Sequence, residues 1–159
     1  MSKQKGFTLI ELLVVIGIIA ILAAVVIVAV NPARQFAQTR NAQRTASVST
    51  ILNAIGQRIS DNKGIFETNC AAGVMPTTTI AIPATAKNMS STAGDYDIAP
   101  CLVPTYVSAM PFDPSATDAH YTSNTDYDSG FTILKNGDTG RVTIAAPGAE
   151  LSITISAER

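Results

Sequence analysis

The chain has 159 residues and a formal net charge of −1, a size that suits one membrane anchor and one small domain. Its charge is distributed unevenly, because residues 1–63 carry seven basic and two acidic side chains whereas residues 64–159 carry four basic and ten acidic ones. The acidic second part argues against nucleic-acid binding through its main surface. The single histidine, His120, argues against a catalytic triad or a zinc site, so we expect no enzyme.

The N-terminal region contains an apolar run, Phe7–Val30, that only Thr8 and Glu11 interrupt. At about 1.5 Å per residue, a helix of this length spans the hydrocarbon layer of a bilayer, about 30 Å thick. A carboxylate at the centre of such a helix costs about 2.5–3.5 kcal/mol, and less near the interface. Glu11 is therefore a functional candidate that needs a partner. Basic residues before the run predict that the N-terminus stays in the cytoplasm.

The residues at the start of this run form a recognisable motif. Lys3-Gln4-Lys5-Gly6, followed by Phe7-Thr8-Leu9-Ile10-Glu11, resembles the leader and cleavage site of type IV prepilins and type II secretion pseudopilins. The resemblance is close from Lys5 to about Val30 and extends in style to about Gly64. It implies cleavage between Gly6 and Phe7 by a prepilin peptidase, followed by N-methylation of Phe7. It also implies an assembly ATPase and a polytopic platform protein as partners.

Two other interpretations of the N-terminus use the same apolar run. An ordinary secretory signal peptide has a shorter apolar region, of about 7–15 residues, with the cleavage site after it. A plain single-pass anchor is long enough, but it requires neither Gly6 nor Glu11. The motif therefore favours a prepilin over both.

Glu11 is the fifth residue after the predicted cleavage site. The new amine of Phe7 lies four positions upstream on the same helix face, so the two groups could pair within one chain. The resemblance implies instead that Glu11 meets the Phe7 amine of a neighbouring subunit during assembly. A pairing available in only one register would select that register, because an unpaired buried charge is costly. The alternative is a carboxylate stabilised merely by the helix macrodipole, by about 0.3–1 kcal/mol.

The segment after the apolar run predicts the rear half of a long stalk helix. Pro32 cannot donate a hydrogen bond to the carbonyl of Val28, so we expect a kink or local melting there. From Ala33 to about Asp61 the sequence favours a helix, and Asn62-Lys63-Gly64 supplies its end. Apolar residues recur at spacings of three and four and should pack against the head: Val48, Ile51, Leu52, Ile55 and Ile59.

The uneven charge allows two interpretations. A basic stalk could complement an acidic head between subunits stacked in a fibre. Alternatively, Arg34, Arg40 and Arg44 flank the membrane or form a solvated helix face.

The C-terminal part predicts a small antiparallel sheet. Residues 65–130 favour loops with two short candidate strands, Thr77–Ile82 and Leu102–Val107, the second demoted to a sheet edge by Pro104. Phe131–Lys135 and Arg141–Ala145 favour an antiparallel hairpin. Leu151–Ser156 alternates apolar and polar residues as a third strand. The predicted fold class is α+β and pilin-like, with a long N-terminal α-helix packed on a small antiparallel β-sheet head.

The loop region holds a candidate metal site. Tyr106–Pro114 resembles the loop before the terminal sheet of major pseudopilins, which bind calcium in a head loop. Asp113, Asp118, Asp126 and Asp128 could supply carboxylate oxygens for calcium, although the spacing of a specific calcium loop is missing. The alternative is a solvated, turn-rich loop.

Two cysteines, Cys70 and Cys101, lie in the part expected outside the cytoplasm, which favours a disulfide. On the chain-entropy model this bridge would contribute about 3–4 kcal/mol. Two free or buried thiols are the alternative. Asn88-Met89-Ser90 fits a glycosylation sequon, a pattern that is common by chance.

These observations divide the chain into a cleaved leader (1–6), a transmembrane assembly helix (7–30), the amphipathic rear half of the stalk (31–64) and an extracytoplasmic head domain (65–159). The resemblance implies a structural subunit of a type IV pilus, a homopolymer built through the N-terminal helix for adhesion, motility or DNA uptake. A pseudopilin forming a short periplasmic fibre for type II secretion is the alternative. A membrane-tethered binding module that never polymerises is a third reading, which Glu11 disfavours. The precursor is expected as a single-pass protein of the cytoplasmic membrane, and the mature subunit in an extracellular pilus or periplasmic fibre.

Overall fold

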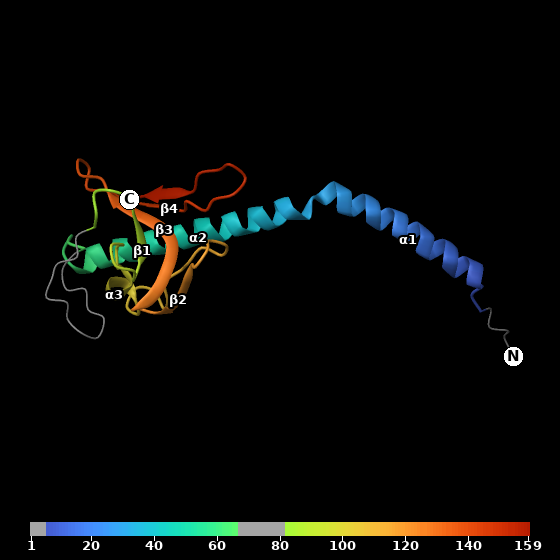
Figure 1. The fold of residues 1–159 in the computed structure, drawn as a ribbon, viewed down its shortest axis with the longest axis horizontal. Coiled ribbons are helices and arrows are strands. Elements are labelled where there is room, and N and C mark those ends of the chain that lie inside the picture. Colours follow the sequence, from blue (N-terminus) through green and yellow to red (C-terminus); the bar gives the residue numbers. More distant parts are fainter. Residues whose placement is uncertain (1–5, 67–81) are drawn as a thin grey trace. The chain divides into compact units, whose positions relative to one another are not determined.

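A computed structural model describes residues 6–66 and 82–159 of the chain. The chain forms two compact units, Met1–Phe36 and Ala37–Arg159. Helix α1 (Leu9–Val30) lies in the first unit. Helix α2 (Pro32–Asp61) begins in the first unit, and its residues from Ala37 onward belong to the second (Figure 1).

The helical stalk is interrupted at Asn31. This residue ends α1 in the left-handed region, with φ of 42°, and α2 starts at the next residue, Pro32. A residue before proline avoids the helical region because the proline ring crowds its backbone. The carbonyl oxygen and side-chain Oδ1 of Asn31 then accept hydrogen bonds from the backbone N–H of Arg34. The break therefore lies one residue before the proline, and Asn31 caps both helices.

Helix α2 packs its apolar stripe into the core of the second unit. Val48, Ile51 and Ile55 are fully buried, as the predicted stripe requires. The helix ends where the sequence indicates, because Lys63 and Gly64 adopt φ of 56° and 93°. The N–H of Gly64 donates to the carbonyl of Ile59 over 2.8 Å, which closes the last turn.

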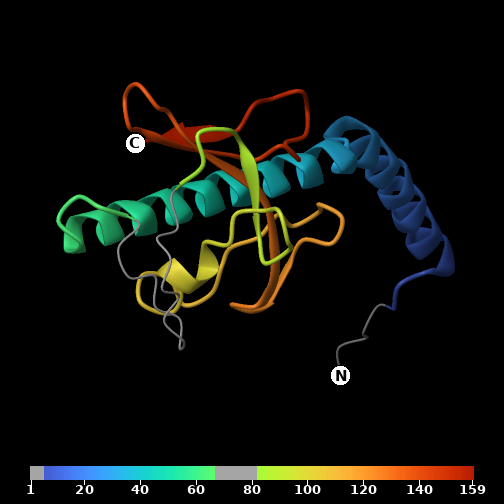
Figure 2. The same ribbon diagram turned by 60° about the vertical axis from the view of Figure 1, so that its left-hand side comes forward.

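One antiparallel sheet forms the rest of this core, together with the short helix α3 (Ala99–Leu102). Its strands run in the spatial order β1-β3-β4-β5, and β2 also pairs with β3. Their bounds are β1 (Lys87–Ser90), β2 (His120–Ser123), β3 (Asp126–Lys135), β4 (Val142–Ala145) and β5 (Ser156–Glu158). Figure 2 shows the sheet crossing α2. The α+β, pilin-like architecture predicted from the sequence is thus confirmed.

The predicted hairpin is present, with a longer first strand. Ile133 lies opposite Ile144, and Lys135 opposite Val142. The N–H of Asn136 donates to the carbonyl of Arg141 over 2.8 Å, and Gly140 takes a positive φ of 70° in the turn.

Two strand predictions are wrong and one cannot be placed. Leu102–Val107 forms the end of α3 and a turn, because Pro104 has no N–H for a strand ladder and Tyr106 donates its N–H to the Leu102 carbonyl. Leu151–Ser156 contributes only its last residue to β5, since Leu151 and Ser152 adopt positive φ in a turn. Thr77–Ile82 lies, except for its last residue, outside the described residues.

Candidate functional site

The N-terminal end of α1 is organised around Glu11. Thr8 is the N-cap, in extended conformation, and its Oγ1 accepts a hydrogen bond from the Glu11 N–H over 3.3 Å. The Glu11 carboxylate reaches back, and its Oε2 accepts from the Thr8 N–H at 2.9 Å and from the Thr8 hydroxyl at 2.7 Å. Thr8 and Glu11 thus form a capping box, in which each satisfies an otherwise open backbone donor of the other.

This capping box explains how a carboxylate is tolerated at the start of an apolar helix. The helix macrodipole is not the only group that stabilises the Glu11 carboxylate, because this carboxylate also accepts two direct hydrogen bonds from Thr8. Both bonds end on Oε2, and within the described residues no donor reaches Oε1. The carboxylate therefore keeps one oxygen open to a partner from outside the chain. The predicted pairing with a Phe7 amine stays a prediction.

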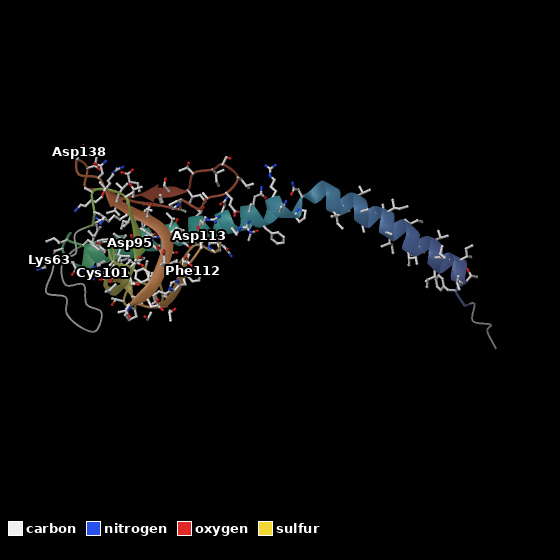
Figure 3. The ribbon with its side chains drawn as sticks, viewed as in Figure 1. Lys63, Asp95, Cys101, Phe112, Asp113 and Asp138 are labelled. Atoms are coloured by element: carbon white, nitrogen blue, oxygen red, sulfur yellow. The ribbon has the colours of Figure 1, made fainter. Side chains whose placement is uncertain are left out.

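Helix α1 has no buried face over its described side chains, Leu9–Ile27. Leu9–Ile27 is long and apolar enough to cross a membrane, and none of it is buried. Its large apolar side chains remain 51–82% exposed, and Figure 3 shows them projecting all around the helix. The core helix of a soluble protein would bury such residues. A helix that is apolar all round needs lipid or other helices to cover it.

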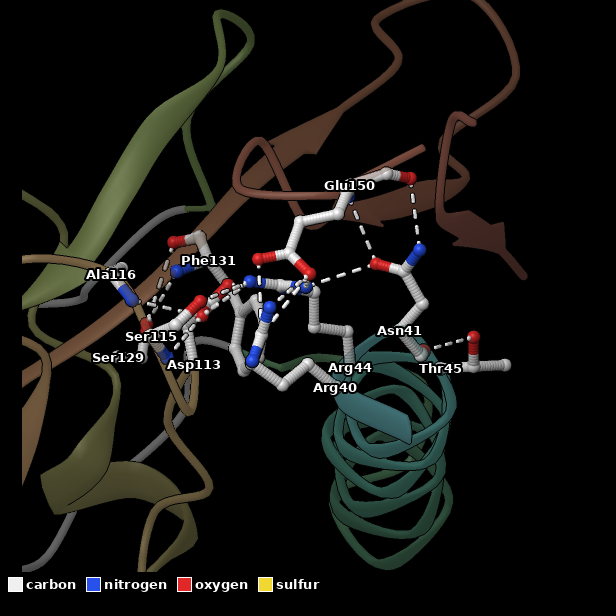
Figure 4. Close-up of polar contacts among 10 residues, drawn as sticks. All are labelled: Arg40, Asn41, Arg44, Thr45, Asp113, Ser115, Ala116, Ser129, Phe131 and Glu150. Atoms are coloured by element: carbon white, nitrogen blue, oxygen red, sulfur yellow. Dashed lines mark hydrogen bonds and ion pairs between the residues drawn. The ribbon is translucent and has the colours of Figure 1, made fainter. Parts of the chain in front are cut away.

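The second unit contains a buried ion pair that the sequence did not reveal. Arg44 and Asp113 have side chains only 1% and 0% exposed. The guanidinium donates from Nε to Asp113 Oδ2 over 2.7 Å and from Nη2 to Oδ1 over 3.0 Å. Figure 4 shows this pair between α2 and the loop that precedes β2. Such bidentate pairs are strong and directional.

Other oxygens complete the surroundings of the Arg44 guanidinium. Asn41 Oδ1 and Ser115 Oγ accept two further hydrogen bonds from it, over 2.9 and 2.7 Å. Glu150 lies 4.0 Å from Nη1 and forms its own close pair with Arg40, over 2.9 Å. Asn41 also exchanges two hydrogen bonds with the backbone of Glu150. The cluster therefore ties α2 to two loops, one around Asp113 and one around Glu150.

The environment of Asp113 favours its charged form. Burial alone would raise the pKa of its carboxyl, but hydrogen bonds from Arg44 and from the N–H groups of Ser115 and Ala116 outweigh this effect, with the Arg44 charge adding to them. The pKa of Asp113 consequently lies below its usual range. Gly148 packs directly above the pair, since a Cβ added there would lie 2.8 Å from Asp113 Oδ2.

The cluster changes the interpretation of two of the stalk arginines. Arg40 pairs with Glu150 of its own chain, and Arg44 is buried against Asp113, so the solvated-face interpretation is wrong for Arg44. Charge complementarity between subunits stays a prediction. Arg58 is also buried, and it donates to the carbonyls of Phe66 and Cys101. Arg34 alone of the three predicted arginines is exposed. A useful signal was available, because Asn41 and Arg44 continue the spacing of the buried stripe towards the start of α2.

The four aspartates proposed as calcium ligands do not converge. Asp113 binds Arg44, Asp126 accepts from the exposed His120 ring, and Asp128 accepts from Asn88 and Gly130. Asp118 is exposed, with φ of 65°. Residues 6–66 and 82–159 contain no group of three metal-binding side chains. The solvated-loop interpretation is also wrong for Asp113, which is buried because it pairs with Arg44.

The remaining sequence features have mixed outcomes. Cys101 is buried in α3 and is not a free thiol. Cys70 lies outside the described residues, so the bridge between them stays a prediction. Asn88 of the sequon donates from its amide to Asp95 and Asp128, and Ser90 is fully buried. This sequon is therefore not presented as an accessible acceptor.

Comparison with known families supports the N-terminal motif. Residues 1–27 match the family described as the prokaryotic N-terminal methylation motif. No curated protein and no solved structure gives a match to the chain. The chain thus carries the prepilin-type leader that is typical of the type IV pilin and pseudopilin family, and its match is confined to the leader and α1.

Proposed function

We propose that this protein is the structural subunit of a type IV pilus filament, which polymerises through its N-terminal hydrophobic helix. One observation carries the proposal: a methylation motif leads directly into a membrane-length helix with no buried face and one capped carboxylate. Such a helix is covered by lipid before assembly and by neighbouring α1 helices afterwards. The resulting fibre serves adhesion, motility or DNA uptake.

Processing creates the group that Glu11 lacks. A prepilin peptidase cleaves the peptide bond between Gly6 and Phe7, which leaves a charged amine on Phe7. The Thr8–Glu11 capping box survives, because none of its atoms belongs to residues 1–6. The amine of a neighbouring subunit then pairs with Glu11 at Oε1, which the capping box leaves open. In a low-dielectric helix bundle this pairing selects one axial register.

Assembly requires machinery that this chain does not supply. The leader is the substrate of the prepilin peptidase, and an assembly ATPase and a platform protein extract the subunit from the membrane. The precursor therefore resides as a single-pass protein in the cytoplasmic membrane, with Lys3 and Lys5 on the cytoplasmic side.

A pseudopilin of a type II secretion system is the alternative, and Tyr106–Pro114 favours it by resemblance. The surroundings of Asp113 argue against a pseudopilin with a calcium-binding loop, because the guanidinium of Arg44 already binds both oxygens that this carboxylate would offer to calcium. Thermal unfolding with calcium and with chelator tests this point. Equal midpoints are expected, and a calcium-dependent midpoint would favour the pseudopilin.

The first experiment shears the cells, collects extracellular fibres, and measures the intact mass and N-terminal residue of this protein in them. An abundant chain beginning at methylated Phe7 is expected. A processed chain found only in the membrane would replace the pilus with the pseudopilin or a minor subunit. A chain that still carries residues 1–6 would overturn the proposal and leave a plain membrane anchor.

A further inference from the structure

The turn between β3 and β4 contains the one asparagine of the chain that is followed by glycine, Asn136-Gly137. All residues of this turn, 136–141, are exposed, and Figure 3 shows Asp138 on the loop that projects beyond the sheet. The side-chain carbonyl carbon of an asparagine, Cγ, can be attacked by the backbone nitrogen of the next residue. Glycine hinders this attack least, because it has no Cβ. The turn is therefore a candidate site of chemical modification.

The side chain of Asn136 is held in a way that favours this attack. Its Oδ1 accepts hydrogen bonds from the N–H of Asp138 over 2.9 Å and from the N–H of Thr139 over 3.2 Å. Attack on Cγ places negative charge on Oδ1, and two backbone N–H groups directed at this oxygen stabilise that charge as an oxyanion hole does. The same two donors polarise the carbonyl before the attack begins. The turn thus activates the carbon that the reaction uses.

The attacking nitrogen is not engaged elsewhere. No hydrogen bond among the described residues uses the N–H of Gly137, although the main chain of Asn136 is fixed on both sides. The N–H of Asn136 donates to the carbonyl of Arg141, and its carbonyl accepts from the N–H of Gly140, each over 2.8 Å. A Cβ added to Gly137 would have nothing within 4 Å. The electrophile is therefore held in place while the nucleophile is unobstructed.

We propose that Asn136 deamidates in the folded protein, through attack of the Gly137 backbone nitrogen on Asn136 Cγ. The new N–Cγ bond forms as the proton of the Gly137 N–H passes to water, and the side-chain nitrogen leaves as ammonia after taking up a proton. Water then opens the resulting succinimide. Cleavage of the new N–Cγ bond gives aspartate, whereas cleavage between the Gly137 nitrogen and the Asn136 main-chain carbonyl carbon gives isoaspartate. Water is the co-reactant, and nothing is oxidised or reduced.

The two products change the hairpin differently. Aspartate at position 136 keeps both N–H contacts as charge-assisted hydrogen bonds and adds one negative charge to the exposed turn. Isoaspartate lengthens the main chain by one methylene group, so the bonds to Gly140 and Arg141 cannot both keep their geometry. The acidic head thus becomes more acidic as the protein ages. This inference does not depend on the proposed function.

Mass spectrometry of the purified full-length protein tests the proposal. The protein is kept in detergent at neutral or mildly alkaline pH and then digested with pepsin in acid, which suppresses further conversion. The peptide with residue 136 is expected to gain the mass difference between an amide and an acid over time, faster at alkaline pH. An isoaspartyl methyltransferase should label part of this product.

Asn124 is a control within the same molecule. It is followed by the β-branched Thr125, and its Oδ1 accepts a hydrogen bond from the Tyr121 hydroxyl over 2.7 Å. Asn124 should therefore keep its amide during the incubation. Equal conversion of Asn124 and Asn136 would contradict a reaction favoured by the β3–β4 turn.

Gly137→Ala is the variant that hinders the attacking nitrogen. It should slow the conversion of Asn136 by at least about fivefold. The thermal unfolding midpoint should not change, because the added Cβ has open space. An unchanged rate in a folded Gly137→Ala protein would overturn the proposal.

Comparison of the folded and unfolded wild-type chain isolates the role of the turn, even if the variant does not fold. Guanidinium chloride removes the two N–H donors from Asn136 Oδ1, so the folded protein should convert at least as fast as the unfolded chain. An Asn136 that stays an amide in the folded protein and converts only after unfolding would overturn the proposal. That result would mean that the turn protects the asparagine.

Discussion

Glu11 and Asp113 are both carboxylates at positions where an unpartnered charge is costly, but the two regions of the chain satisfy them differently. Asp113 is buried, and a residue 69 positions away neutralises it while donors occupy both of its oxygens. Glu11 is held only by Thr8, three positions away, through one oxygen. The head satisfies its charges within one chain, whereas the N-terminal helix leaves both its carboxylate and its apolar surface incomplete. Assembly is therefore expected to depend on the N-terminal unit and stability on the second unit.

The largest expected effect breaks this comparison at Glu11. Glu11→Ala should abolish fibre formation while the protein stays in the membrane, is processed, and keeps its thermal unfolding midpoint. The reason is that alanine removes the acceptor proposed for a neighbour's amine, while the head keeps all of its own residues. Fibre yield after shearing and a melting curve of the purified protein measure the two effects.

Glu11→Gln is the matched control, because glutamine maintains a capping box but carries no charge. It should also assemble poorly. Normal assembly of Glu11→Gln would show that capping, rather than charge pairing, is the role of this residue.

The second effect breaks the head instead. Arg44→Ala should lower the free energy of unfolding by about 3–5 kcal/mol, because it leaves Asp113 charged and buried without its partner. Tyrosine fluorescence during urea unfolding reports this change, since the chain has no tryptophan. Arg34→Ala is the control, and it should change stability by less than about 0.5 kcal/mol because Arg34 is exposed. Equal stabilities of the two variants would contradict the importance of the buried pair.

Much of the fold was accessible from the sequence because it follows local patterns. The apolar run, the stripe from Val48 to Ile55, the glycine at the end of α2 and the hairpin of β3 and β4 each depend on spacing or turn residues. The turn at Leu151 was missed because its alternating sequence fits a strand, whereas Glu150 is fastened to α2 by tertiary contacts. Strand β1 was missed because Lys87–Ser90 has little strand propensity and pairs with β3 through tertiary context.

The same difference between local patterns and tertiary contacts applies to the candidate site. The Gly6–Phe7 motif and Glu11 are readable because they are contiguous and stand out in an apolar run. The partner of Arg44 is not readable, since any of several acidic residues in the second half could have paired with it. The sequence indicated Asp113 as a carboxylate that could bind a cation. The predicted cation was calcium, whereas in the structure it is the guanidinium of Arg44.

A third, smaller effect tests how closely the head is packed around the ion pair. A Cβ at position 148 would lie 2.8 Å from Asp113 Oδ2 and 3.6 Å from Arg44 Nη2. Gly148→Ala should therefore cost about 1–3 kcal/mol, as overpacking does in cores. Gly137→Ala is the matched control, because nothing lies within 4 Å of its added Cβ. Urea unfolding compares both, and no difference between them would mean that the pair can shift to make room.

The pH dependence of the free energy of unfolding should reveal the contribution of the buried Asp113 carboxylate. Because the folded state lowers the pKa of Asp113, its contribution to stability is complete above the ordinary aspartate pKa of about 3.9. It is lost as the pH falls through the lowered pKa. Asp113→Asn should be less stable at neutral pH and should show a flatter loss of stability in acid. Parallel curves for the two proteins would exclude Asp113 from the acid transition.

The smallest expected effect returns to the N-terminal unit and sharpens the comparison within it. Thr8→Val removes the hydroxyl that both accepts from the Glu11 N–H and donates to Glu11 Oε2, while the donor at the Thr8 N–H remains. Loss of an N-cap costs about 1 kcal/mol, which corresponds to roughly a fivefold shift in equilibrium. Fibre yield should fall by about that factor, and Thr8→Ser should restore it because serine keeps the hydroxyl. A wild-type yield from Thr8→Val would show that the backbone N–H alone positions Glu11. A yield as low as that of Glu11→Ala would show instead that Glu11 Oε1 can pair with a neighbour only when the Thr8 hydroxyl holds Oε2 in place.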